Sequence, residues 1–175
     1  MSTRCQILVD GHSASIYRHS DGYPDGVLHD LLPLVREFTA VRGNDPEYLS
    51  AQIVHHLVAR HRREIAQLKK GYKDRGETMG RLGDELPYLG YGVEGFSGTF
   101  HGDEAYIYVV KQDHVEVRET VGGFGVSADS ATLANTKVIR RVGFDGAMIV
   151  DLSSSISRVR RGQGRLGQGG RSRAG

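Results

Sequence analysis

The chain has 175 residues, of which 38% are hydrophobic and 25% are charged, so it is long enough for one ordinary domain with a modest core. It contains no tryptophan and a single cysteine, Cys5, which excludes an intrachain disulfide framework and a zinc site built from several cysteines. No apolar run approaches the roughly 18 residues of a membrane-spanning helix, and we see no signal peptide, so we expect a cytoplasmic protein without a membrane partner.

The first expected elements are two strands, residues 5–9 and 14–18, which are rich in β-forming side chains and flank an Asp-Gly turn signal. They predict a β-hairpin. The next eight residues, His-Ser-Asp-Gly-Tyr-Pro-Asp-Gly at 19–26, form a dense loop signal that precludes regular structure. Gly22 and Gly26 are the residues of this loop that can adopt positive φ without cost.

Two helices are expected after the loop. Apolar residues recur at helical spacing, but Pro33 within this pattern predicts a kink, or a helix that begins only at about Asp30. Asp45 as N-cap and Pro46 as first residue predict the start of a second, longer amphipathic helix that forms a hairpin with the first. Residues 71–83 are polar and punctuated by glycine, so they are expected to form a long loop.

Strand signals resume at residues 88–94, 105–111 and 114–119, whereas residues 138–151 indicate only a weak strand or loose structure. The predicted order is β-β-α-α-β-β-β. Short hairpin connections favour an α+β fold with an antiparallel sheet of about five strands and the helical hairpin on one face. The chain is thereby divided into an α+β core domain, a loosely structured extension and a tail, at residues 3–120, 121–152 and 153–175.

The net charge of +2 is unevenly distributed along the chain. Residues 153–175 carry six arginines and no acidic side chain, so the remaining residues have a small excess of acid. This glycine-rich tail has too few apolar side chains to offset the entropy of ordering it, and we expect it to be disordered. A nucleic-acid-binding protein that contacts phosphates non-specifically through the tail is therefore one functional hypothesis.

Two His-x-Asp strings lie in glycine-rich turns next to predicted strands: His19 with Asp21, and His101 with Asp103. Imidazole and carboxylate together are a fair ligand set for zinc, manganese or iron. If the two strand ends are neighbours, the pairs can meet, which makes a metal-dependent hydrolase a second hypothesis. The usual zinc-motif spacings are missing, however, so we expect no cofactor rather than a transition metal.

Tyrosines on the strand at 105–111 suggest a ligand-binding face. Tyr106 and Tyr108 point to one side, opposite Ile107 and Val109. If the helices cover the Ile107 side, the tyrosines line the open side of the sheet, where aromatic rings can stack nucleotide bases. The alternative is that tyrosine is simply a good strand former on a half-exposed or oligomer-forming face.

The loop at residues 19–26 gives the remaining candidates. It presents His19, Asp21 and Tyr23 at the sheet edge beside a helix N-terminus, where outward N–H groups suit an anion. The alternative is that these residues only steer the chain from hairpin to helix. With Tyr106 and Tyr108, these three side chains are the candidate ligand-binding residues.

Other strings carry less chemistry. Residues 90–95 match the dinucleotide-binding pattern G-x-G-x-x-G, but no helix start follows, so we expect a strand whose glycines permit close packing. Cys5 begins a predicted buried strand and is expected to be an inert thiol.

Three strings together resemble a family of small, mostly uncharacterised proteins of phages, prophages and haloarchaeal viruses. These strings are Ser-Thr-Arg at residues 2–4, the HSDGYP loop with its flanks at 17–26, and Leu-Gly-Tyr-Gly-Val-Glu at 89–94. The resemblance spans about residues 2–120 and lends no fold, activity or catalytic residue, but it implies a virus-encoded accessory protein. Our leading hypothesis is therefore a non-enzymatic protein, single or homo-oligomeric, that binds a host protein or a nucleotide-like anion, with an anti-defence role as one version.

Overall fold

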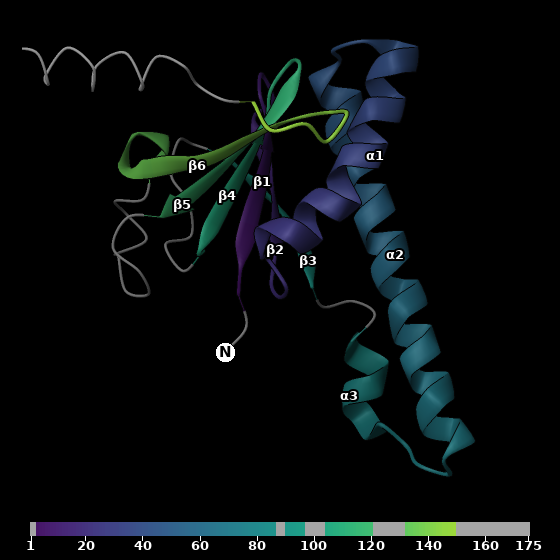
Figure 1. Ribbon diagram of the computed structural model, residues 1–175. Helices are drawn as coiled ribbons and strands as arrows, with labels where there is room; N and C mark the ends of the chain where they lie inside the picture. Colours follow the sequence, from purple (N-terminus) through teal and green to yellow (C-terminus); the bar gives the residue numbers. More distant parts are fainter. Residues whose placement is uncertain (1–2, 87–89, 97–103, 121–131, 150–175) are drawn as a thin grey trace, which may run out of the picture.

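The computed structural model describes residues 3–86, 90–96, 104–120 and 132–149. Six strands in these ranges form one sheet in the order β3-β2-β1-β4-β5-β6, with the two long helices on one side of it (Figure 1). The elements in chain order are β1 (Cys5–Val9), β2 (Ala14–Arg18), α1 (Pro24–Arg42), α2 (Pro46–Asp74), α3 (Gly80–Glu85), β3 (Tyr91–Gly95), β4 (Tyr106–Val110), β5 (His114–Thr120), the 3₁₀ turn η3 (Leu133–Asn135) and β6 (Thr136–Gly143). The predicted α+β class is confirmed.

The sheet is mixed, so the expectation of a purely antiparallel sheet is wrong. β1 pairs with β2 antiparallel on one side and with β4 parallel on the other, while all remaining pairs are antiparallel. The reason is that β3 pairs with the outer edge of β2 and β4 with the free edge of β1, so β3 and β4 lie on opposite sides of the hairpin and run in the same direction. A sixth strand, β6, pairs with β5, and the sheet therefore continues past the expected domain boundary at residue 120.

The first helix begins within the expected loop. α1 starts at Pro24 and continues through Pro33, so the alternative of a start at about Asp30 is wrong, and residues 24–26 are helical although the loop signal precluded regular structure there. Pro24 occupies the first turn, where its missing N–H costs no helical hydrogen bond, and Asp25 adds favourable negative charge there. Asp45 caps α2 as expected, because its side chain accepts a hydrogen bond from the Tyr48 backbone N–H.

Residues 71–83 do not form the expected long loop. α2 extends to Asp74 and α3 follows after a short turn. Ion pairs one helical turn apart, Lys70 with Asp74 and Arg81 with Glu85, stabilise these helices despite their low apolar content. Within the described ranges, no helix is both long and apolar enough to span a membrane.

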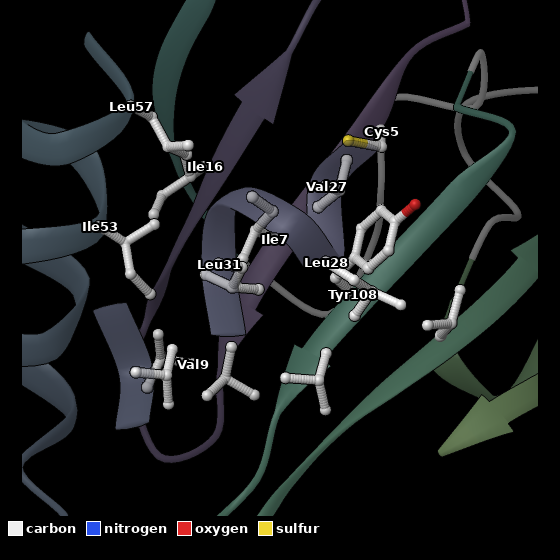
Figure 2. Close-up of a cluster of buried hydrophobic side chains, with 14 of the residues drawn as sticks. Cys5, Ile7, Val9, Ile16, Val27, Leu28, Leu31, Ile53, Leu57 and Tyr108 are labelled. Carbon is white, nitrogen blue, oxygen red and sulfur yellow. The ribbon is translucent and has the colours of Figure 1, made fainter. Parts of the chain in front are cut away.

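The main core lies between the sheet and the two long helices. Figure 2 shows Val27, Leu31 and Ile53 from the helices gathered against Ile7 of β1, with the ring of Tyr108 in the same layer. Tyr108 is completely buried, so burial of an aromatic ring and several branched aliphatic side chains supplies the hydrophobic free energy that holds the helices on this face.

The helices cover the Tyr108 side of the sheet. The predicted open face of tyrosines required the helices to cover the Ile107 side, so that prediction is wrong for Tyr108. Ile107 and Val109 belong to a second buried cluster on the opposite side, with Leu8 as the third buried member. Phe96 packs against this cluster. The alternation of side chains along β4 is as predicted, with Tyr108 on one side and Ile107 on the other. Both sides of β4 are apolar in the sequence, however, so the pattern cannot indicate which side receives the helices.

Candidate functional site

A cleft of about 480 Å³ opens between α1 and the end of β6. One wall is α1 and the other is β6 with the turn that follows it. The lining residues from α1 are Asp25, Leu28, His29, Leu32, Pro33 and Arg36, and those from the other wall are Arg140, Val142, Phe144, Asp145, Gly146 and Met148.

The α1 wall is one stripe of the helix. Asp25, Leu28, Leu32 and Arg36 follow one another at intervals of three or four residues, which places them on the same side of a helix. Leu28 is buried and ties the stripe to the main core, while Leu32 is half-buried at its edge. The stripe thus combines an apolar centre with a carboxylate at one end and a guanidinium at the other.

The opposite wall is built by a tight reversal of the chain after β6. The Gly143 N–H donates to the Ala147 carbonyl oxygen at 2.8 Å, and Gly146 adopts a φ of 89°, a left-handed conformation that favours glycine. The Asp145 carboxylate accepts a hydrogen bond from the Ala147 N–H at 2.9 Å, which fixes the turn. The reversal brings Met148, which is 56% exposed, to the mouth of the cleft.

The charged side chains of the cleft are unequally satisfied. Arg140 donates to the Asp25 carboxylate at 3.1 Å, so this ion pair joins the two walls at one end. Within the described part of the chain, the guanidinium of Arg36 makes no hydrogen bond or ion pair. The exposed ring of His29 lies on the same wall, with Nδ1 3.3 Å from a buried carboxylate oxygen of Asp30. Among the described residues, the cleft therefore offers one guanidinium without an ionic partner beside an apolar surface, and one carboxylate, that of Asp145, which is bonded to a backbone N–H.

Asp30 is the centre of a separate cluster of ion pairs, in which Arg60 also pairs with Glu64. Its buried carboxylate receives a hydrogen bond from Arg18 at 3.2 Å and contacts Arg60 of α2. Arg18 also donates to the Ser20 carbonyl oxygen at 2.8 Å. Because the two arginines come from β2 and α2, the cluster ties the end of the hairpin to both long helices, which is a structural role.

The loop at residues 19–26 packs tightly against β1. Gly22 is buried, its N–H donates to the Thr3 carbonyl oxygen at 2.9 Å, and its carbonyl oxygen accepts from the Tyr108 hydroxyl at 2.8 Å. A Cβ atom on Gly22 would lie 2.9 Å from the Cβ atom of Cys5, so close approach requires glycine here. The positive φ expected at the glycines occurs instead at Asp21, with a φ of 55°.

The structure separates the five predicted ligand-binding residues. Tyr23 and Tyr106 come together, with ring centroids 6.3 Å apart, and Tyr23 is 59% exposed. His19 lies beside Tyr17 instead, with 3.4 Å between the hydroxyl oxygen and Nδ1. Tyr108 is fully buried, and this burial raises the pKa of its hydroxyl well above the ordinary value. Tyr108 therefore does not line an open face.

The remaining sequence candidates concern metal chemistry and thiol reactivity. His19 and Asp21 are exposed, whereas His101 and Asp103 lie outside the described residues. Cys5, which pairs with Arg18 on β2 and with Tyr106 on β4, separates the two strand ends. Among the residues that the structure describes, no group of three or more His, Cys, Asp or Glu side chains is arranged to hold a metal ion.

The thiol of Cys5 is buried as expected, and burial raises its pKa to about 12. At neutral pH the group is therefore protonated and a poor nucleophile.

Sequence reasoning missed the residues that give the cleft its chemistry, Arg36, Arg140, Phe144 and Met148. The three from the second wall lie in a region where glycines weaken the strand signal. The available signal was an arginine in line with the apolar stripe of α1. Comparisons with protein-family models, with curated proteins and with solved structures find no match for this chain.

Proposed function

We propose that this protein is an accessory binding protein whose cleft between α1 and β6 holds a small amphipathic anion, with nucleotides as the leading class. The observation that carries the proposal is the combination of apolar side chains and an arginine without an ionic partner among the described residues. A volume of about 480 Å³ is in the range of small-molecule sites.

Each wall supplies a different part of the recognition. Phe144 and Met148 offer an aromatic ring and a polarisable thioether, which are favourable neighbours for a planar base. Arg36 offers a planar set of donors that fits two oxygens of one phosphate. The ligand would therefore span the cleft, with its apolar part over the turn after β6 and one anionic group at Arg36 of α1. Sequestering a nucleotide signal would be a role of the kind that the viral resemblance implies.

A binding panel tests this proposal. Mono-, di- and cyclic nucleotides are screened by thermal shift, and the dissociation constant of each stabilising compound is measured by calorimetry. We expect Arg36→Gln to weaken the best compound by about tenfold or more, because the charge-assisted hydrogen bonds to phosphate are lost. Phe144→Ala should weaken it as well.

The matched control is Arg63→Gln, which removes an exposed arginine of α2 outside the cleft lining and should leave the dissociation constant unchanged. A panel without any stabilising compound would sink the nucleotide version. Equal affinities of Arg36→Gln and the unsubstituted protein would sink the cleft as the site.

A further inference from the structure

The carboxylate of Asp25 holds the guanidinium of Arg140 in an ion pair. Without this carboxylate, the cleft would present the guanidinium to a ligand. The donor and acceptor atoms are 3.1 Å apart, and both side chains line the cleft. The Asp25 side chain is 93% exposed and that of Arg140 is 37% exposed. Exposed pairs of this kind contribute little to stability because water competes with both partners.

The two partners come from segments more than one hundred residues apart in the chain. Asp25 lies in the first turn of α1, where a negative charge is favourable whether or not Arg140 is present. Arg140 lies on β6, whose position is fixed by its pairing with β5. Neither backbone therefore depends on the ion pair, and the guanidinium can exchange one anion for another without a change of fold.

We infer that Asp25 is an internal competitor for Arg140: its carboxylate holds the guanidinium in the ligand-free protein and is displaced by a second anionic group, which belongs to a ligand whose first anionic group binds Arg36. This inference rests on the proposed function. A carboxylate with one charge is outcompeted by a phosphate group with about two charges and three acceptor oxygens. The competition therefore selects ligands with a terminal phosphate or a polyphosphate and disfavours monoanions.

Calorimetry with ATP as the probe tests the competition. Asp25→Asn keeps the shape of the side chain but removes its charge, so we expect ATP to bind about three- to tenfold more tightly than to the unsubstituted protein. The comparison variant is Glu37→Gln, which removes one charge from an exposed side chain of α1 outside the cleft lining. We expect it to tighten ATP binding by less than about twofold, from net charge alone.

A double substitution locates the effect. In an Arg140→Gln background, Asp25→Asn should no longer improve ATP binding, because the guanidinium for which it competes is absent. Equal gains from Asp25→Asn and Glu37→Gln would overturn the inference, as would a gain from Asp25→Asn that persists without Arg140. Absence of ATP binding at millimolar concentration in both the unsubstituted protein and Asp25→Asn would also overturn it.

These results are distinguishable from a failure of the proposed function. If Arg36→Gln binds the best compound of the panel as well as the unsubstituted protein does, the cleft is not the site and the proposed function fails. If Arg36→Gln weakens binding but Asp25→Asn does not improve it beyond Glu37→Gln, only the competition is wrong.

Discussion

The loop at residues 19–26 and the cleft between α1 and β6 differ in what holds their polar groups. The loop backbone is constrained by hydrogen bonds, whereas the cleft has a charged side chain that is available to a ligand. The loop is dense in turn-forming residues, and the backbone N–H and carbonyl of its buried Gly22 bond to Thr3, just before β1, and to Tyr108. The cleft is assembled from distant segments, and within the described residues the guanidinium of Arg36 has no partner. The conspicuous run of turn-forming residues in the loop reflects the conformation that its backbone must adopt. The side chains that could contact a ligand are those of the cleft, and no sequence motif marks them.

This difference has an energetic basis. A buried turn requires particular residues because each N–H and carbonyl must find a partner and each Cβ must fit. The fold depends little on the side chains that line an open cleft. Substituting them therefore has small effects on stability and large effects on binding. Substitutions in the loop and around the cleft test this difference, and the largest effect is expected at Gly22.

Gly22→Val should destabilise the protein by about 3 kcal/mol or more, because the new side chain meets backbone atoms and not a flexible chain end. A Cβ atom there would lie 2.9 Å from the Arg4 carbonyl carbon and 3.0 Å from the Cys5 nitrogen. Urea unfolding gives the change in free energy.

The matched control for this substitution is Gly26→Ala in α1, where the nearest atom to a Cβ would be the Asp21 carbonyl oxygen at 3.8 Å. It should be neutral or stabilise by about 0.5–1 kcal/mol, because alanine favours the helix. A Gly22→Val protein as stable as the control would break the contrast.

Acid should loosen the β6 wall of the cleft through Glu116 of β5. Burial opposes ionisation of this carboxylate, but hydrogen bonds from Arg141 at 3.0 Å and Arg118 at 3.1 Å outweigh it, so its pKa is lowered. A group with a lowered pKa stabilises the fold fully above its unfolded-state pKa and loses this contribution as the pH falls through its folded-state pKa.

Glu116→Gln should therefore cost about 1 kcal/mol at neutral pH, as charge-assisted hydrogen bonds become neutral ones. It should also lose less stability than the unsubstituted protein between about pH 6 and pH 3, measured by urea unfolding. Glu37→Gln removes an exposed carboxylate of α1 and should keep the full acid sensitivity. Identical pH profiles for Glu116→Gln and the unsubstituted protein would contradict the prediction.

The smallest effect on stability is expected for the double variant His19→Ala, Tyr23→Ala. Both side chains are exposed, so the melting temperature should stay within a few degrees, and nucleotide binding at the cleft should be retained. Loss of binding in this variant, with an unchanged melting temperature, would indicate that the ligand binds at the loop and not at the cleft. Retained binding, together with its loss in Arg36→Gln, would sharpen the distinction between loop and cleft.

Local patterns were informative where one physical requirement dominates. The Asp-Gly turn predicted the β1–β2 hairpin, Asp45 predicted the cap of α2, and the buried Cys5 followed from an apolar strand. They failed where two requirements conflict. Pro33 predicted a kink or a start of α1 at about Asp30, but the helix begins at Pro24, because packing of Val27 and Leu31 in the core stabilises its first turns.

The amino-acid sequence by itself determined the α+β class, most of the strands and the two long helices, because helical and strand periodicities are local properties of side-chain spacing. Only the tertiary structure decided that β4 pairs with β1 in parallel, that the helices cover the Tyr108 side, and that Arg36 faces β6 across a cleft. Those outcomes depend on which apolar surface is buried against which, and β4 is apolar on both sides. The side of β4 that packs against the helices depends on the burial of the whole sheet, and the spacing of residues along the chain does not indicate it.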